Sequence, residues 1–350
     1  MPSADMVGRA QAMAESGDHA GVIATLATIP LERLATDGKR MLAQAYARTD
    51  QRGEARRVYQ ALAESPSAVP SDHFELGVLY ARDQRWGLAI ESLERAESQG
   101  LSGVRLHEEL ALAHAAIGNH RGTPLLRRVV DAAPGQLCDE GYVWKAAAPP
   151  QEGYLICPKA SAIYHVVRAR QLGADSPQLE RIRADIFSES GDLAVALAIY
   201  RSIEPRIPGD QQAEFCARFA ELLLACGDVD GYVQKLREAA RRDRHRYGPT
   251  LAAAYGRAAA ERSMAGDLDG YIRNLKLAIE SSPGSAELHY RLGNALWEAG
   301  QLAEAAGQWL TVIELDPQHP DRERLLELVR ELSIAQDATS ADEHPLARQP

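Results

Sequence analysis

Turn residues that recur at a nearly constant spacing are the feature that most constrains how this chain can fold. The first four turns, at positions 17, 50, 84 and 118, lie 33 to 34 residues apart, and the last two, at 266 and 300, keep the same spacing. Such a period is typical of helix–turn–helix units, each of which buries its apolar face only by stacking on its neighbours. The turns are Gly17–Asp18, Asp50, Gln84, Gly118–Asn119, Gly191–Asp192, Gly227–Asp228, Gly266–Asp267 and Gly300. The spacing predicts a repeat array, and 350 residues exceed the usual limit for one compact core.

The repeat is clearest near the C-terminus, where the sequence from residue 286 reads AELHYRLGNALWEAGQLAEAAGQWLTVIELDP. Apolar residues recur at helical spacing on both sides of Gly300, and Pro317 ends the second segment. The small residues Gly293 and Ala305 would let the two helices approach closely. A second copy of this pattern begins near Pro70.

These segments resemble the tetratricopeptide repeat. The C-terminal copy matches the family pattern at Leu292, Gly293, Leu296, Ala305, Trp309 and Pro317, and the other copy at Leu76, Gly77, Tyr80, Ala89, Leu93 and Ala96. The resemblance implies an all-α fold, a right-handed superhelical array of antiparallel helix pairs of the α-solenoid type. Eight copies are expected, beginning near residues 3, 36, 70, 104, 177, 213, 252 and 286.

The pattern fails between residues 134 and 158, where prolines and glycines are frequent. The amphipathic sequence that follows, KASAIYHVVRARQLG, is interpreted as the second helix of a ninth copy whose first helix is short or lost. The expected segments are an N-terminal array (1–134, about four repeats), an irregular insertion (135–158), a C-terminal array (159–319, about four and a half repeats), a capping helix (320–336) and a disordered tail (337–350). We expect the insertion to divide the array into two halves.

The insertion is richer in aromatic residues than the rest of the chain. Tyr142, Trp144 and Tyr154 supply the apolar surface that would hold it against its neighbours. Two interpretations stay open. These side chains cover the exposed ends of the two half-arrays, or they line a partner site.

The family resemblance also implies where a partner would bind, because the first helices of successive copies form the concave wall of the superhelix. Arginines are prominent at the expected groove positions, so an acidic peptide is the partner they would suit. The expected groove residues are Arg40, Gln44, Arg48, Phe74, Arg82, Arg105, Tyr290, Asn294 and Trp297.

Composition and motifs argue against other classes of function. The formal net charge of -10 disfavours nucleic acid and anionic membranes, and no run of apolar residues is long enough to span a bilayer. Neither the P-loop nor the dinucleotide-binding glycine motif occurs, and the four cysteines have no metal-ligand spacing. His107 and His114 lie two turns apart on one helix and are interpreted as core histidines. We therefore expect no catalytic residues, no metal and no cofactor.

Three function classes remain from the sequence. The first is a cytoplasmic, bacterial protein-interaction scaffold or adaptor that binds a peptide segment or partner protein in the groove. The second is a dedicated assembly or regulatory subunit of a stable complex, and the third, more remote, is an enzyme with an unrecognised site. Homo-oligomerisation is not indicated.

Overall fold

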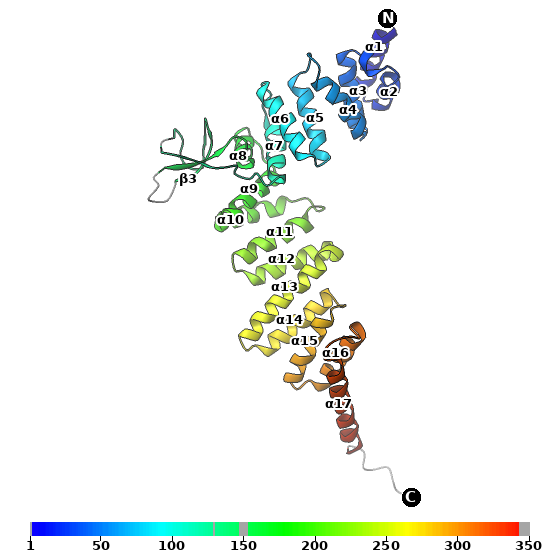
Figure 1. Cartoon of the computed structure of the whole chain (residues 1–350), viewed down its shortest axis with the longest axis vertical. Helices are drawn as coiled ribbons and strands as arrows, with labels where there is room; N and C mark the ends of the chain where they lie inside the picture. Colours follow the sequence, from blue (N-terminus) through cyan, green and yellow to red (C-terminus); the bar gives the residue numbers. More distant parts are fainter. Residues whose placement is uncertain (1, 129, 147–152, 343–350) are drawn as a thin grey trace. The chain divides into compact units, whose positions relative to one another are not determined.

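The computed structural model describes residues 2–128, 130–146 and 153–342. The chain divides into two units, residues 1–203 and 204–350, and each contains consecutive antiparallel helix pairs (Figure 1). In the described part of the chain there are eight such pairs, followed by one further helix. The repeat architecture expected from the sequence is confirmed. None of the described helices is both long and apolar enough to cross a membrane.

The first unit contains five helix pairs. Its helices are α1 (Pro2–Glu15), α2 (His19–Leu26), α3 (Thr36–Arg48), α4 (Arg52–Ala63), α5 (Pro70–Arg82), α6 (Trp86–Ser98), α7 (Val104–Ala116), α8 (Ala162–Gln171), α9 (Pro177–Glu189) and α10 (Leu193–Ile203), with a 3-10 turn η1 (Leu31–Arg33). The first helices of neighbouring pairs also contact one another: α1 contacts α3, α5 contacts α7, and α7 contacts α9. The first helices therefore share one face of this unit.

The second unit contains three helix pairs and the last helix. Its elements are the 3-10 turn η2 (Glu204–Arg206) and the helices α11 (Gln212–Ala225), α12 (Val229–Arg242), α13 (Arg244–Met264), α14 (Leu268–Ser281), α15 (Ala286–Glu298), α16 (Leu302–Leu315) and α17 (Arg322–Asp342). Helix α13 begins at Arg244, earlier than the copy expected near residue 252. The reason is local, since the Asp243 side chain accepts a hydrogen bond from the backbone N–H of Arg246 (3.0 Å) and caps the helix there.

All eight predicted turns adopt the same backbone conformation. The residue that ends each first helix has a φ between 58° and 81°, in the left-handed region. Glycine provides it at six turns, whereas Asp50 and Gln84 take it with φ values of 58°. The next backbone N–H then bonds back to the last turn of the helix, as Gln301 does to the carbonyl of Leu296 (2.8 Å). At seven of these turns, three residues separate the two helices of a pair, which sets the repeat spacing; the turn at Gly118 leads into the insertion.

Two glycines allow the paired helices to touch. A Cβ added at Gly77 would lie 2.7 Å from Cγ of Leu93, and one at Gly293 would lie 2.4 Å from Nε1 of Trp309. Leu93 is fully buried and Trp309 is 2% exposed. Both contacts join the first helix of a pair to its second helix, which is the role that the sequence predicted for these small residues.

The fourth helix pair differs from the sequence interpretation. Helix α7 packs against α8, although residues 117–161 separate them. The backbone N–H groups of Ala162 and Ile163 donate to the carbonyls of Asn119 (3.0 Å) and His120 (3.0 Å), so α8 begins beside the turn that ends α7. The segment 162–171 is thus the second helix of the fourth copy and not part of a ninth. The insertion lies inside one repeat, and α7 and α8 both contact α9, so the array continues past it.

The insertion is a small antiparallel sheet and not an irregular segment. Its strands are β1 (Leu125–Arg127), β2 (Leu137–Cys138), β3 (Gly141–Ala146) and β4 (Tyr154–Pro158), in the spatial order β1-β4-β3-β2. Figure 1 shows the sheet beside α8. Ile156 and Cys157 are consecutive on the inner strand β4 and are both fully buried, so both faces of that strand are covered there, whereas the edge strand β1 is largely exposed. The proline-rich residues 147–152 lie outside the described residues.

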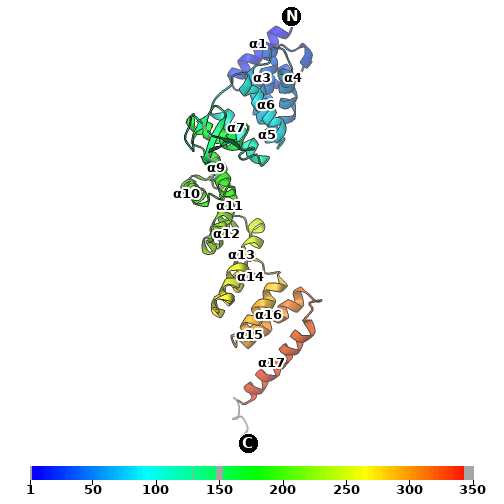
Figure 2. The ribbon, with the colours of Figure 1, turned by 60° about the vertical axis from the view of Figure 1, so that its left-hand side comes forward.

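The last helix covers the end of the final pair. Helix α17 packs on α16, with Leu325 buried and Leu328, Val329 and Leu332 partly buried against the same cluster (Figure 2). It continues to Asp342, beyond the expected end at residue 336, so part of the expected disordered tail is helical. The remainder, residues 343–350, lies outside the described residues.

Candidate partner-binding surface

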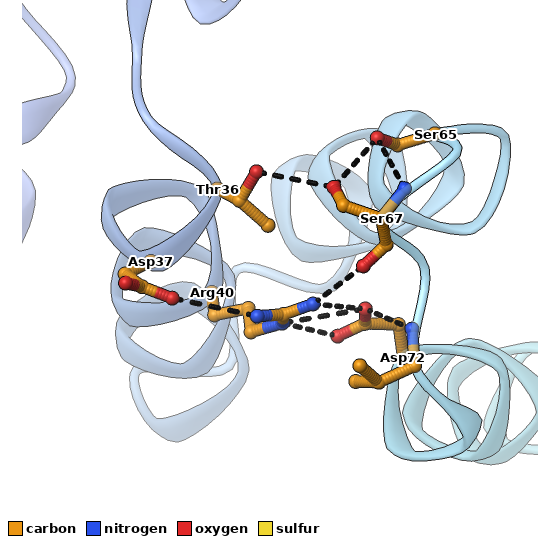
Figure 3. Close-up of polar contacts among 7 residues, drawn as sticks. Thr36, Asp37, Arg40, Ser65, Ser67 and Asp72 are labelled. Atoms are coloured by element: carbon orange, nitrogen blue, oxygen red, sulfur yellow. Dashed lines mark hydrogen bonds and ion pairs between the residues drawn. The ribbon is translucent and has the colours of Figure 1, made fainter.

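Arg40, a predicted groove residue, joins two neighbouring helix pairs (Figure 3). Its guanidinium donates to both carboxylate oxygens of Asp72 on α5, with Nε–Oδ1 and Nη2–Oδ2 distances of 3.0 Å, and to the carbonyl of Ser67 (3.0 Å). Asp72 is 2% exposed and also accepts the backbone N–H of Val69 at the start of α5 (3.0 Å). The pKa of Arg40 is raised, chiefly by its hydrogen bond to Asp72. Arg40 therefore fastens α3 to α5.

Arg105 and Phe74 form the next link along the same face. The Arg105 guanidinium lies 5.2 Å from the centre of the Phe74 ring, which joins α7 to α5. Phe74 is 7% exposed, so its ring is largely covered. Two more predicted groove residues thus take part in contacts between repeats.

Gln44, Arg48 and Arg82 are exposed. Arg48 and Arg82 are the last residues of α3 and α5, and they occupy equivalent places in consecutive repeats. Within the described residues, neither arginine forms an ion pair. Their charge is therefore available to a partner.

Carboxylates lie close to Arg82 and Arg105. Burial raises the pKa of Glu109 on α7, while the positive charges of Arg105 and Arg82 act in the opposite direction and Glu75 adds to the increase. The face presented by α5 and α7 is therefore mixed in charge.

The predicted groove residues of the second unit lie on α15. The Tyr290 hydroxyl donates to Asp321 Oδ2 (2.7 Å), and Asn294 Oδ1 accepts the indole N–H of Trp309 (3.2 Å). Trp297 is 41% exposed, and its ring centre lies 5.6 Å from that of Trp309. Trp297 is the apolar side chain of this set that a partner could cover.

The insertion aromatics mostly face inward. Tyr142 is 6% and Trp144 7% exposed, and the Trp144 ring stacks on Phe187 of α9 with ring centres 4.9 Å apart. The Arg121 guanidinium lies 5.4 Å from the centre of the Trp144 ring. Tyr154 is half-buried on β4. This burial supports the interpretation that the insertion covers neighbouring helices, which here are α8 and α9.

A cavity in the second unit was not foreseen from the sequence. It has a volume of about 900 Å³ and is lined by α12, α13 and α14. Its charged lining is mixed, since Arg237 and Arg241 face Glu238 and Glu261. Arg237 also donates to the Tyr255 hydroxyl (2.8 Å). The sequence offered a weak signal, because the basic stretch 237–246 contributes two of these arginines.

The stacked antiparallel pairs define an α-helical repeat protein, and the first helices of its first unit share a face. The family model described as tetratricopeptide repeat matches residues 40–102 and 272–320. These two segments are tetratricopeptide repeats, and the resemblance seen in the sequence is confirmed for them. These matches include both copies that were clearest in the sequence.

Two solved structures align with most of this chain at low sequence identity. The C-terminal part of a TPR repeat-containing protein from Cytophaga hutchinsonii is 14% identical, with a TM-score of 0.49 over 81% of this chain and 98% of that one. The APC/C hetero-tetramer Cut9–Hcn1 is 11% identical, with a TM-score of 0.38 over 92% of this chain and 55% of that one. No curated protein matches the sequence.

Proposed function

We propose that the chain is a non-catalytic scaffold or adaptor that binds an acidic peptide segment of a partner protein along the first helices α3, α5 and α7. Binding of other proteins is the general role of tetratricopeptide repeats, two stretches of which the family model matches. We also propose that the protein is bacterial and cytoplasmic, and that it catalyses no reaction.

The observation that carries this proposal is the pair Arg48 and Arg82. They are exposed, occupy equivalent positions in consecutive repeats, and have no ion-pair partner within the described residues. An unpaired arginine keeps its five donors for a carboxylate, which it can bind in bidentate fashion. Gln44, one turn before Arg48 on α3, adds an exposed amide that can bond to a peptide backbone.

The test is affinity capture from the native cell with the full chain and a variant carrying Arg48→Glu and Arg82→Glu. A matched control carries Arg95→Glu and Arg201→Glu, which reverse two exposed arginines on the second helices α6 and α10. We expect the groove variant to lose a partner that the wild type and the control retain. The wild-type affinity should fall with added salt, because exposed charges are screened beyond about 10 Å at 0.1 M ionic strength.

Equal capture of the partner by both variants would show that the partner does not bind at Arg48 and Arg82 on α3 and α5. A partner that stays bound through high salt and resists both variants would indicate a permanent subunit interface. That outcome favours the assembly or regulatory subunit over the adaptor.

A further inference from the structure

Three helices bring histidine and glutamate side chains together at the boundary between the third and fourth repeats. His107 comes from α7 and His165 from α8, and they are 3% and 2% exposed. Glu94 and Glu97, one turn apart on α6, face these helices. This cluster could not be predicted from the sequence, because the helix that carries His165 was assigned there to a different repeat from α7.

The three nearest groups have the spacing of metal ligands. Nδ1 of His107 lies 3.0 Å from Nδ1 of His165 and 3.8 Å from Oε1 of Glu97, and one ligand atom from each residue lies within 4.8 Å of the others. A tetrahedral zinc ion with ligands at about 2.0–2.1 Å separates two nitrogen ligands by about 3.3 Å. Small side-chain movements would therefore bring all three groups to ligand distance.

Both proposed histidine ligands lie in surroundings that suit metal binding. His107 and His165 are almost fully buried, and burial disfavours a charged ring. Only the neutral ring offers a lone pair to a cation.

Among the described residues, no lysine or arginine forms an ion pair with Glu94 or Glu97. A divalent ion at this point would supply the missing positive charge. The Glu97 side chain is 36% exposed, which leaves a path for the ion from solvent.

A third buried histidine lies at the same boundary between the third and fourth repeats. His114 on α7 is 2% exposed, and its ring lies parallel to that of His165, with centres 5.5 Å apart. Its Nε2 has no hydrogen-bond partner within the described residues and lies 3.7 Å from Oε1 of Glu94. A buried imidazole nitrogen without a partner is costly, so the local arrangement is incomplete as it stands.

We propose that His107, His165 and Glu97 bind one Zn²⁺ ion, with water at the fourth position and Glu94 and His114 as the surrounding polar groups. Two imidazoles and a carboxylate are ligands that zinc accepts. Three protein ligands and a water are the usual set of a catalytic zinc site, but this ion would lie between three helices and would serve to hold them together.

At this position in the fold, the ion would stabilise the pairing of α7 with α8. Helices α7 and α8 must pair across residues 117–161, and a longer connection costs more entropy to close than the short turns of the other pairs. A metal clip between α6, α7 and α8 would offset that cost. It would also hold the third repeat to the fourth.

The competing explanation is a metal-free core contact. At 3.0 Å, one neutral histidine can donate its Nδ1–H to Nδ1 of the other, which satisfies both atoms without an ion. Glu97 would then stay an unpaired carboxylate beside the pair.

The experiment uses the full chain, purified without a histidine tag, treated with chelator and titrated with Zn²⁺ by calorimetry. We expect one equivalent to bind and the melting temperature to rise with zinc concentration, since an ion that binds only the folded state stabilises it. The variants are His165→Gln, His107→Gln and Glu97→Gln, and each should weaken binding at least about 100-fold. Glu97→Gln is the variant least disturbing to folding, because its side chain is at the surface.

The matched control is His289→Gln. His289 is also buried, at 8% exposure, but it bonds to Gln308 and to the Pro283 carbonyl in another repeat. Zinc uptake by this control should equal that of the wild type. Replacement of zinc by Co²⁺ should give the intense visible absorption of a four-coordinate site, which Glu97→Gln should remove.

Absence of zinc binding by the wild type would overturn the proposal in favour of the hydrogen-bonded pair. Equal uptake by the wild type and Glu97→Gln would also overturn it. Uptake that survives in the histidine variants but disappears when the thiols are blocked would assign the metal to cysteines such as Cys226, which is exposed.

Discussion

Replacement of Arg40 by leucine tests how neighbouring repeats hold together. Arg40 on α3 binds the carboxylate of Asp72 on α5, which is almost fully buried (Figure 3). Leucine keeps much of the aliphatic stem of arginine and removes its five donors. The Asp72 carboxylate would keep only the backbone N–H of Val69.

The magnitude follows from the exposure of the two partners. Removal of one partner from a fully buried pair costs about 3–5 kcal/mol, whereas exposed pairs contribute at most about 1 kcal/mol. The Asp72 side chain is 2% exposed and that of Arg40 is 25% exposed. We therefore expect Arg40→Leu to weaken this boundary by about 2 to 3 kcal/mol. A second change, Asp72→Asn, should recover at least half of the loss, because a neutral amide still accepts the Val69 N–H.

Amide hydrogen exchange in the full chain measures how much Arg40→Leu weakens the boundary between α3 and α5. Each repeat contacts mainly its neighbours, so opening should be local. We expect exchange of the α3 and α4 amides to rise by about thirtyfold for a loss of 2 kcal/mol. The amides of α15 and α16 in the second unit should not change. A rise of less than about threefold, with normal partner binding, would refute the reasoning from burial. Normal exchange with lost partner binding would instead place Arg40 in the groove, as the sequence predicted.

Four other outcomes are expected. Gly293→Ala should lower the melting temperature, since its Cβ would lie 2.4 Å from the indole nitrogen on α16. Gln84→Gly should raise the unfolding free energy by up to about 1 kcal/mol in denaturant titrations, because φ is 58° at this turn. In the zinc-free chain, acid should lower the free energy of unfolding between pH 6.5 and about 4, because His107 and His114 have folded pKa values lowered to about 4 and the unfolded chain binds protons first. At pH 5 the expected loss is about 2 kcal/mol for each histidine, measured by urea unfolding. Trp144→Ala should create a protease-sensitive site in the insertion while the helix content by circular dichroism is kept.

The local signals in the sequence predicted most of the helical framework. Six of the eight turns were found because glycine followed by a polar residue encodes a left-handed helix end within a few residues. Asp50 and Gln84 were recovered only through the spacing, since neither residue type favours that conformation as glycine does. Close helix contacts at Gly77 and Gly293 followed from the same repeat pattern.

The insertion was beyond this kind of reasoning. Its strands are short, and β2 has only two residues, so no alternation of apolar and polar residues was long enough to detect. The pairing of α7 with α8 depends on complementary apolar faces brought together across a long connection, which adjacency along the sequence cannot show. The sheet is held by Trp144 and Tyr142, whose aromatic character was noticed but whose contacts on α8 and α9 were not.

The groove residues show why a face predicted from helix phase is only partly a binding site. A repeat array must join its first helices to one another, and the side chains nearest the neighbouring helix do this first. Arg40 binds Asp72, and Arg105 covers Phe74, near the starts of their helices. Arg48 and Arg82, at the helix ends, have no such partner within the described residues. Recognition is therefore expected where consecutive helices end, because there the arginine charges are not already used to hold the repeats together.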